Sequence, residues 1–179
     1  MFDKLIDVLI NLGKDILPFT VVDQWEKAVF LRLGKFNKVV GPGLIWKFPF
    51  MDTVLPTEVV TKTVHLQPQT LTTLDEYNIV LKSIVRYHVH DVQKYLLTVM
   101  HASDVLVDTT QGIIRDIVET TKWYDLENVN SVITEKVKDA VEKKWGITIE
   151  LVTLTDLGIV NTYRLMTDNN KVSLQQNQD

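Results

Sequence analysis

Two histidines in this 179-residue chain have a spacing that could bind a metal ion. His88 and His90 lie two residues apart, which places both side chains on one face of a strand. Asp91 and His101 follow nearby. Zinc needs three or four such ligands, and the sequence places neither a third nor a fourth. We therefore interpret the two histidines as part of a polar strand face and predict no metal site.

The other signatures of catalysis are weak. Asp75 and Glu76 are adjacent acids in a predicted turn, where nothing apolar surrounds them to raise a carboxyl pKa for acid–base chemistry. The chain has no Gly-x-Ser-x-Gly motif, no cysteine and no phosphate-binding glycine loop. We predict a protein that is not an enzyme, with no catalytic residue and no cofactor.

Charge and aromatic residues are distributed unevenly along the chain. Hydrophobic residues make up 45% of it, enough for a packed core, and the formal net charge of −4 argues against a nucleic-acid-binding protein. Residues 1–50 hold 7 Lys+Arg and 5 Asp+Glu, which leaves 12 and 18 for the rest of the totals of 19 and 23. All six phenylalanines also lie in residues 1–50. This basic, aromatic-rich part therefore needs an explanation in the function of the protein.

Residues 2–17 predict an amphipathic helix that ends before Pro18. No apolar run reaches the roughly 20 residues of a spanning helix. One interpretation is a helix that lies in a membrane surface, and the alternative is a helix packed on its own domain or on a neighbouring subunit. The membrane-contacting residues of this arm would be Phe2, Leu5, Ile6, Leu9, Leu12, Ile16 and Leu17.

The segment after the arm mixes basic and aromatic residues. Such a mixture can hold single-stranded nucleic acid, can anchor a domain on an anionic bilayer, or can place its aromatic rings in a core. We favour the bilayer because the apolar arm is adjacent. The predicted membrane-contacting residues here are Lys27, Lys35, Lys38, Trp46, Lys47, Phe48 and Phe50.

The periodicity of the remaining chain predicts strands first, then helices, then a final strand. Alternation is clearest at residues 77–90, and shorter strands are expected at 29–33, 44–48, 54–61, 63–66 and 69–74. Helices are expected at 91–99, 102–121 and 130–145, followed by a strand at 147–159 in which Leu151 shares a face with Ile149. This order predicts an α+β domain with an antiparallel sheet. We expect an amphipathic helix at 1–19, the domain at 20–159 and a polar tail at 160–179.

Several segments, in order along residues 21–158, resemble the SPFH or band 7 superfamily of stomatin, prohibitin and flotillin. The segment Gly41-Pro42-Gly43-Leu44 with the following Pro49 and Asp52 is similar to its GPG-L-x(4)-P-x(2)-D motif. Residues 29–35 resemble its V-x-R-x-G strand, and residues 71–90 its L-T-x-D turn and long strand. Residues 124–126 and 145–149 resemble the entry to its last helix and final strand.

The resemblance implies a non-catalytic scaffold that attaches to membranes through its amino-terminal element. It implies assembly into a ring or cage of identical copies and a membrane-protein client such as a protease or a channel. Because the arm is charged and amphipathic, we expect peripheral attachment to one leaflet, on the cytoplasmic side. No heptad repeat follows the domain, so assembly would depend on the domain and its arm. The alternative is a soluble oligomer whose amino-terminal helix packs between subunits.

Overall fold

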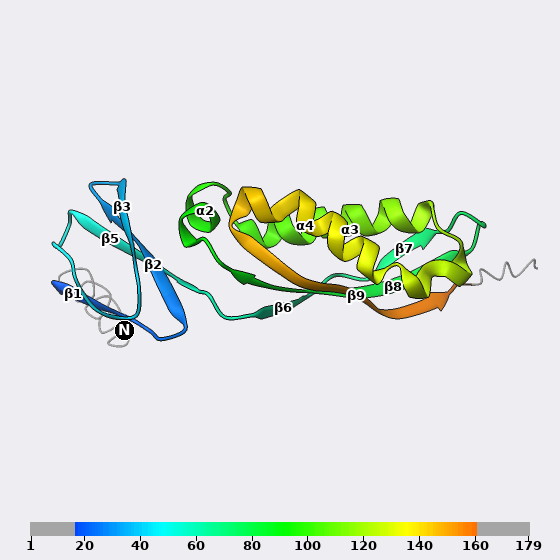
Figure 1. The fold of residues 1–179 in the computed structure, drawn as a ribbon, viewed down its shortest axis with the longest axis horizontal. Coiled ribbons are helices and arrows are strands. Elements are labelled where there is room, and N and C mark those ends of the chain that lie inside the picture. The colour runs from blue at the N-terminus through cyan, green and yellow to red at the C-terminus, as the bar shows by residue number, and fades with distance from the viewer. Residues whose placement is uncertain (1–16, 161–179) are drawn as a thin grey trace, which may run out of the picture.

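The computed structural model describes residues 17–160. The predicted amino-terminal helix and polar tail therefore lie almost entirely outside the described residues. The described chain is elongated, with five short strands at one end and helices along one face of a longer sheet at the other (Figure 1). Antiparallel strands and separate helices confirm the predicted α+β class.

The first five strands form two small antiparallel sheets. Strand β1 (Phe19–Val22) pairs with β4 (Gly43–Trp46), and β2 (Glu26–Arg32) lies between β3 (Lys35–Val40) and β5 (Asp52–Glu58). A small apolar core joins the two sheets, consisting of Val22, Ala28, Phe30 and Val40, with Ile45 and Val54 packed against them. Among the described residues β5 pairs with β2 alone, so it is an edge strand, a position that tolerates its Pro56.

A longer sheet is built around the central strand β8 (Asn78–Val89). Strand β9 (Ile147–Ile159) pairs with nearly all of β8. Strands β6 (Lys62–His65) and β7 (Gln69–Thr72) pair with successive parts of its opposite edge. The alternation predicted for β8 is confirmed, because every second residue from Ile79 to Val89 is buried.

The three predicted helices are confirmed at α2 (Val92–Leu97), α3 (Ala102–Glu119) and α4 (Asn130–Trp145), with a 3₁₀ helix η1 (Trp123–Asn128) before the last. Their apolar faces join the β8–β9 sheet in the main core, which also reaches Val29 of β2. The side chain of Asp91 accepts a hydrogen bond from the backbone N–H of Lys94 and so caps α2.

The prediction that Leu151 shares a face with Ile149 is wrong. Leu151 is 38% exposed, whereas Val152 is fully buried. The register explains this, because Tyr87 pairs with Ile149 and the neighbouring Arg86 pairs with Leu151, which leaves Glu150 as an extra residue in β9. Such a bulge moves the following side chains to the opposite face, so simple alternation fails beyond it.

Asp75 lies in the predicted turn, but its carboxylate is bound by neighbouring groups and is only partly exposed. Its carboxylate accepts a hydrogen bond from the Thr73 hydroxyl at 2.5 Å and another from the backbone N–H of Trp123 at 3.1 Å. These two hydrogen bonds, the one from Thr73 foremost, hold the pKa of Asp75 below its usual value. Asp75 therefore connects the turn after β7 to the start of η1, which is a structural role.

Gly146 forms hydrogen bonds that join the end of β8 to the start of β9. It ends α4 with a φ of 69°, and its carbonyl accepts hydrogen bonds from the backbone N–H groups of His90 and Asp91, each at 3.0 Å. A Cβ at this position would collide with the carbonyl oxygen of Asp91. Only glycine fits both this conformation and this close approach.

Candidate functional site

An ion pair lies at the end of β2, next to the turn that leads into β3, and it holds this end of the first five strands together. Arg32 ends β2 and Asp52 begins β5, and the two residues are partners in the strand register. Arg32 donates from Nε to Oδ1 of Asp52 at 2.8 Å and from a terminal nitrogen to Oδ2 at 3.0 Å. The Asp52 side chain is fully buried, whereas that of Arg32 is 47% exposed. A buried carboxylate bound at both oxygens is a fixed anchor for the backbone around it.

Asp52 also forms hydrogen bonds that hold the loop at residues 47–51. The backbone N–H of Phe48 donates to Oδ2 of Asp52 at 2.9 Å, and the N–H of Asp52 donates to the Phe48 carbonyl at 3.0 Å. The hydrogen bonds from Arg32 and, next, from Phe48 lower the pKa of Asp52. The guanidinium carbon of Arg32 also lies 5.6 Å from the centre of the Phe48 ring, within cation–π range.

Two apolar residues at this end adopt a backbone conformation that they rarely take. Leu33 has a φ of 51° in the two-residue turn between β2 and β3, and Phe50 has a φ of 68° in the loop. Asn or Gly is usual in such a turn, because a side chain with a Cβ is disfavoured at positive φ. Strain of this kind persists where the surroundings impose it, and it often marks a functional site.

The same residues are among the most exposed apolar side chains of the described structure. Phe50 is 91% exposed, and Leu33, Phe48 and Met51 are exposed as well. The N–H of Leu33 donates to the carbonyl of Met51 at 2.7 Å, which joins the turn to the loop. We call Leu33, Phe48, Phe50 and Met51 the apolar tip. Its side chains face solvent from a rigid support, so they are available to an apolar partner.

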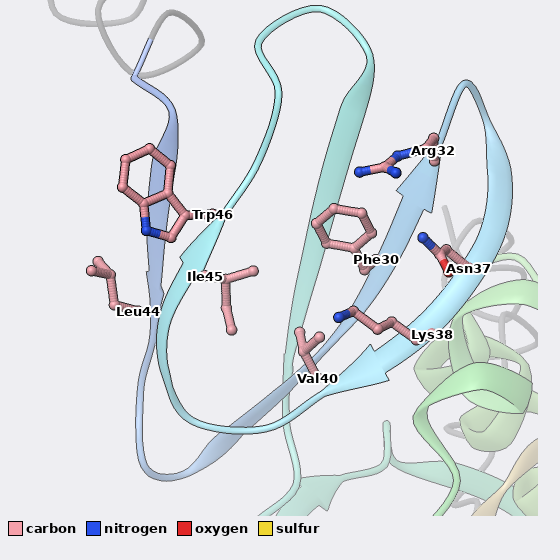
Figure 2. A pocket seen from close by; sticks show the side chains of 8 residues that line it. All are labelled: Phe30, Arg32, Asn37, Lys38, Val40, Leu44, Ile45 and Trp46. Carbon is pink, nitrogen blue, oxygen red and sulfur yellow. The ribbon is translucent and has the colours of Figure 1, made fainter.

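A pocket of about 400 Å³ lies beside the tip, between β3 and β4. Phe30, Val40 and Ile45 form its apolar wall, and Arg32 and Lys38 supply its charge. In Figure 2 the guanidinium of Arg32 and the ammonium of Lys38 lie on either side of the Phe30 ring, and the ammonium points toward Ile45 across the gap. The two cationic groups are 5.8 Å and 5.9 Å from the centre of that ring.

Most of the predicted membrane-contacting residues after the arm come together here. Phe48 and Phe50 belong to the tip, Lys35 follows the Leu33 turn, and Lys38 and Trp46 line the pocket. Trp46 is 70% exposed and meets Phe19 edge to face, with 6.5 Å between ring centres. The alternative that the aromatic rings belong to the core therefore holds for Phe30, which is 3% exposed, and fails for Trp46.

The structure does not bring Lys27 to the same place. Lys27 pairs with Thr57 at the far end of β2, five residues from Arg32 and so about 17 Å away along the strand. Lys47 lies in the loop, and its backbone N–H donates to the Pro18 carbonyl at 2.9 Å. Leu17 is 45% exposed. The other predicted arm residues lie outside the described residues: Phe2, Leu5, Ile6, Leu9, Leu12 and Ile16.

The two histidines take part in local polar contacts. Nδ1 of His88 lies 3.1 Å from Oε1 of Glu150, which also accepts a hydrogen bond from the Thr61 hydroxyl at 2.7 Å, and His90 contacts Thr148. The hydrogen bond from Thr61, followed by that from His88, lowers the pKa of Glu150. Within residues 17–160, no three His, Cys, Asp or Glu side chains are grouped so that they could hold a metal ion.

Sequence reasoning missed Leu33, Met51 and the anchoring role of Asp52. Leu33 precedes Gly34 between two strand segments, and a two-residue turn at this point would have shown that the leucine is exposed. The burial of Asp52 had no comparable signal, because its partner Arg32 is twenty residues away.

None of the helices in residues 17–160 combines the length and apolar character that a membrane span requires.

Comparison with known proteins places these features in a family. The profile of the SPFH domain / Band 7 family matches residues 20–179. The chain is 30% identical to Protein HflK of Haemophilus influenzae over 88% of its own length and 38% of that protein. It is 32% identical to the Modulator of FtsH protease HflK of Escherichia coli over 56% of its own length and 24% of that protein.

An uncharacterised protein of Methanocaldococcus jannaschii is 25% identical over 79% of this chain and 73% of its own length. The chain thus spans well under half of the HflK proteins that it matches. The family profile, by contrast, covers most of the chain, including all of the strands and helices described above except the first residue of β1. On this basis the protein belongs to the SPFH domain / Band 7 family.

Proposed function

We propose that this protein is a non-catalytic scaffold that attaches to one leaflet of a membrane, on its cytoplasmic side, through the apolar tip and the amino-terminal arm. Copies of the chain would assemble into a ring or cage that organises the membrane or regulates a membrane protein. The apolar tip is the observation that carries this proposal. Leu33 and Phe50 are held exposed at positive φ, a strained conformation that no burial in the core explains.

The size of the tip suits weak and repeated attachment. A large apolar side chain contributes about 1.5–3 kcal/mol when it is fully buried, and the tip offers four of them before the cost of ordering is subtracted. A single copy would therefore bind a bilayer weakly. Many copies in one assembly would bind together much more strongly, because each attached copy raises the effective concentration of the others at the surface.

The charge around the tip supports a bilayer with anionic lipids. Arg32, Lys35 and Lys47 flank the tip, and a surface lysine or arginine near such a bilayer contributes about 1 kcal/mol. Exposed aromatic rings next to basic side chains are also typical of the interface between water and lipid. The acidic residues that outnumber the basic ones lie in the rest of the chain. We propose that this acidic part faces away from the membrane.

The name of one relative suggests the kind of client. The Escherichia coli relative is named for modulation of the FtsH protease. We propose that the present chain acts likewise on a membrane protein, with a protease as the first candidate. Because the chain matches only part of that relative, the client contact is a proposal separate from membrane attachment.

Flotation with vesicles tests the attachment. The full chain is mixed with vesicles that contain phosphatidylglycerol, and it is compared with Phe50→Ser and with a chain that lacks residues 1–16. The deletion keeps Pro18, whose carbonyl binds the loop. Tyr124→Ser is the matched control, because Tyr124 is 81% exposed on η1, at the other end of the molecule.

We expect the full chain and Tyr124→Ser to float equally, and both Phe50→Ser and the deletion to float less. Equal flotation of all four proteins would contradict a role of the tip and the arm. Light scattering of the full chain, with and without lipid, tests the assembly. A large and uniform particle that forms without lipid and is lost in the deletion would favour the soluble oligomer whose arm packs between subunits.

A further inference from the structure

We infer that the pocket between β3 and β4 binds the phosphate of one anionic phospholipid from the bilayer. This inference rests on the proposed membrane attachment and adds a specific headgroup site to it. The pocket of about 400 Å³ contains two cationic groups, and none of its eight lining residues is acidic. A site with this charge is complementary to an anion.

Lys38 is the main cation of the site. Its ammonium lies 5.9 Å from the centre of the Phe30 ring, which holds it at the pocket wall, and it forms none of the ion pairs found within residues 17–160. The ammonium carries three donors, and a phosphate oxygen is a strong acceptor for them. Lys38 thus brings a positive charge that no carboxylate of the described structure neutralises.

Arg32 supplies a second set of donors from the other side of the Phe30 ring. A guanidinium has five N–H donors, and two of these bind Asp52. The remaining three are not used for Asp52. The side chain is 47% exposed, so these donors can reach a ligand. Asp52 fixes the orientation of the guanidinium in advance, which lowers the entropic cost of binding. Asn37, which lines the same pocket, adds a neutral amide donor.

The position of the pocket relative to the apolar tip favours a lipid phosphate over a soluble anion. Phe30 lies two residues before Arg32 on β2, and Arg32 contacts Phe48 of the tip. Two strand residues span about 7 Å. When the tip enters the boundary of the acyl chains, both cations therefore lie at the depth of the headgroups, which add about 5–7 Å to each side of the hydrocarbon core.

The test measures vesicle binding of the full chain and of single variants. Lys38→Gln removes the proposed contact, and Lys136→Gln removes the same charge from an exposed position on α4. Lys38→Arg keeps the charge. Vesicles of phosphatidylcholine alone are compared with vesicles that also contain phosphatidylglycerol. Dihexanoyl phosphatidylglycerol, a soluble lipid, and inorganic phosphate are titrated separately while the backbone amide signals of Asn37 and Lys38 are followed by NMR.

We expect Lys38→Gln to weaken binding to the anionic vesicles about fivefold, the equivalent of one lysine at the surface, and Lys136→Gln to change it less than twofold. Lys38→Arg should bind as the unchanged chain does. The soluble lipid should shift both amide signals, and inorganic phosphate should shift them only at far higher concentration.

Equal losses in the two glutamine variants, or equally strong binding of inorganic phosphate, would overturn the headgroup site. Flotation that depends on Phe50 but not on Lys38 would overturn the site and leave the proposed function standing. Failure of the unchanged chain to bind either kind of vesicle would overturn both.

Discussion

Arg32 and Asp52 are opposite each other on neighbouring strands, and the buried carboxylate of Asp52 joins the guanidinium to the backbone of Phe48. One side chain thus fixes both the charge at the pocket and the loop of the apolar tip. Removal of either partner leaves the other without its compensating charge, and for buried Asp52 this is unfavourable.

Asp52→Asn should loosen the loop and lower the stability of the protein at neutral pH. The folded-state pKa of Asp52 is lowered, so its contribution to stability is fully present above the unfolded-state pKa, about 3.9, and is lost as the pH falls through the folded-state value. Urea unfolding at neutral pH and in acid measures this. The stability difference between the unchanged chain and the variant should shrink below about pH 4.

Asp156→Asn is the matched control for this experiment, because Asp156 is exposed and pairs with exposed Lys82. An exposed pair contributes little, so the control should unfold almost as the unchanged chain does. A stability difference for Asp52→Asn that is constant between neutral pH and acid would show that the carboxylate charge is not the cause.

Leu33→Asn should stabilise the fold and weaken membrane binding at the same time. Asparagine adopts the φ of 51° more readily than leucine does, so the free energy of unfolding should rise by up to about 1 kcal/mol. The loss of one apolar side chain should lower vesicle flotation. Thermal unfolding and flotation of the same sample measure both effects. A variant that is less stable than the unchanged chain would contradict the strain assigned to Leu33.

Gly146→Ala should be strongly destabilising. The left-handed conformation alone costs a residue with a Cβ roughly 1–2 kcal/mol, and the collision with the Asp91 carbonyl adds to this. Gly112→Ala is the matched control, since Gly112 lies within α3 with open space around it and should gain about 1 kcal/mol. Urea unfolding of both variants measures the contrast. Equal stability of the two would disprove the steric explanation.

Thr134→Val should destabilise the protein by about 1–3 kcal/mol, because it leaves buried backbone groups without partners. The Thr134 hydroxyl accepts from the N–H of Val152 at 3.0 Å and donates to the Asn130 carbonyl at 2.7 Å, with the Val152 carbonyl 3.2 Å away. Side chains of Asn130 and Glu142 similarly accept from the N–H groups of Leu154 and Ile149. These contacts close the outer edge of β9 to further strands.

Thermal unfolding and size-exclusion chromatography compare Thr134→Val with Thr134→Ser, which keeps the hydroxyl. The valine variant should unfold earlier and form aggregates, whereas the serine variant should behave nearly as the unchanged chain does. Aggregation of both variants to the same extent would show that the hydroxyl does not protect the edge.

Sequence periodicity was sufficient to predict an element where its apolar residues recur at a regular spacing. The alternation from Ile79 to Val89 predicted a strand that is buried on one side, and the helix predicted at 130–145 is α4 with those bounds. Regular periodicity has a single interpretation here because the local pattern and the tertiary burial agree.

Sequence periodicity failed to predict burial where a residue distant in the sequence decides which side chains are buried. The bulge at Glu150 depends on the register with Arg86 and Tyr87, and the burial of Asp52 depends on Arg32. The exposure of Trp46 follows from its position on β4, which pairs only with β1 and leaves the ring uncovered. These features arise from pairing between strands, which one sequence does not reveal.

The length of strand β9 also sets the distance between the first five strands and the far end of the described structure. It runs for 13 residues, Ile147–Ile159, from the side of the helical part that is nearest to the first five strands to the far end of the molecule, where the described chain ends at Val160 (Figure 1). At about 3.3 Å per residue this is roughly 40 Å. If the tip rests on a bilayer, β9 acts as a stiff spacer, and its length sets how far from the lipid surface a partner at that end would be held.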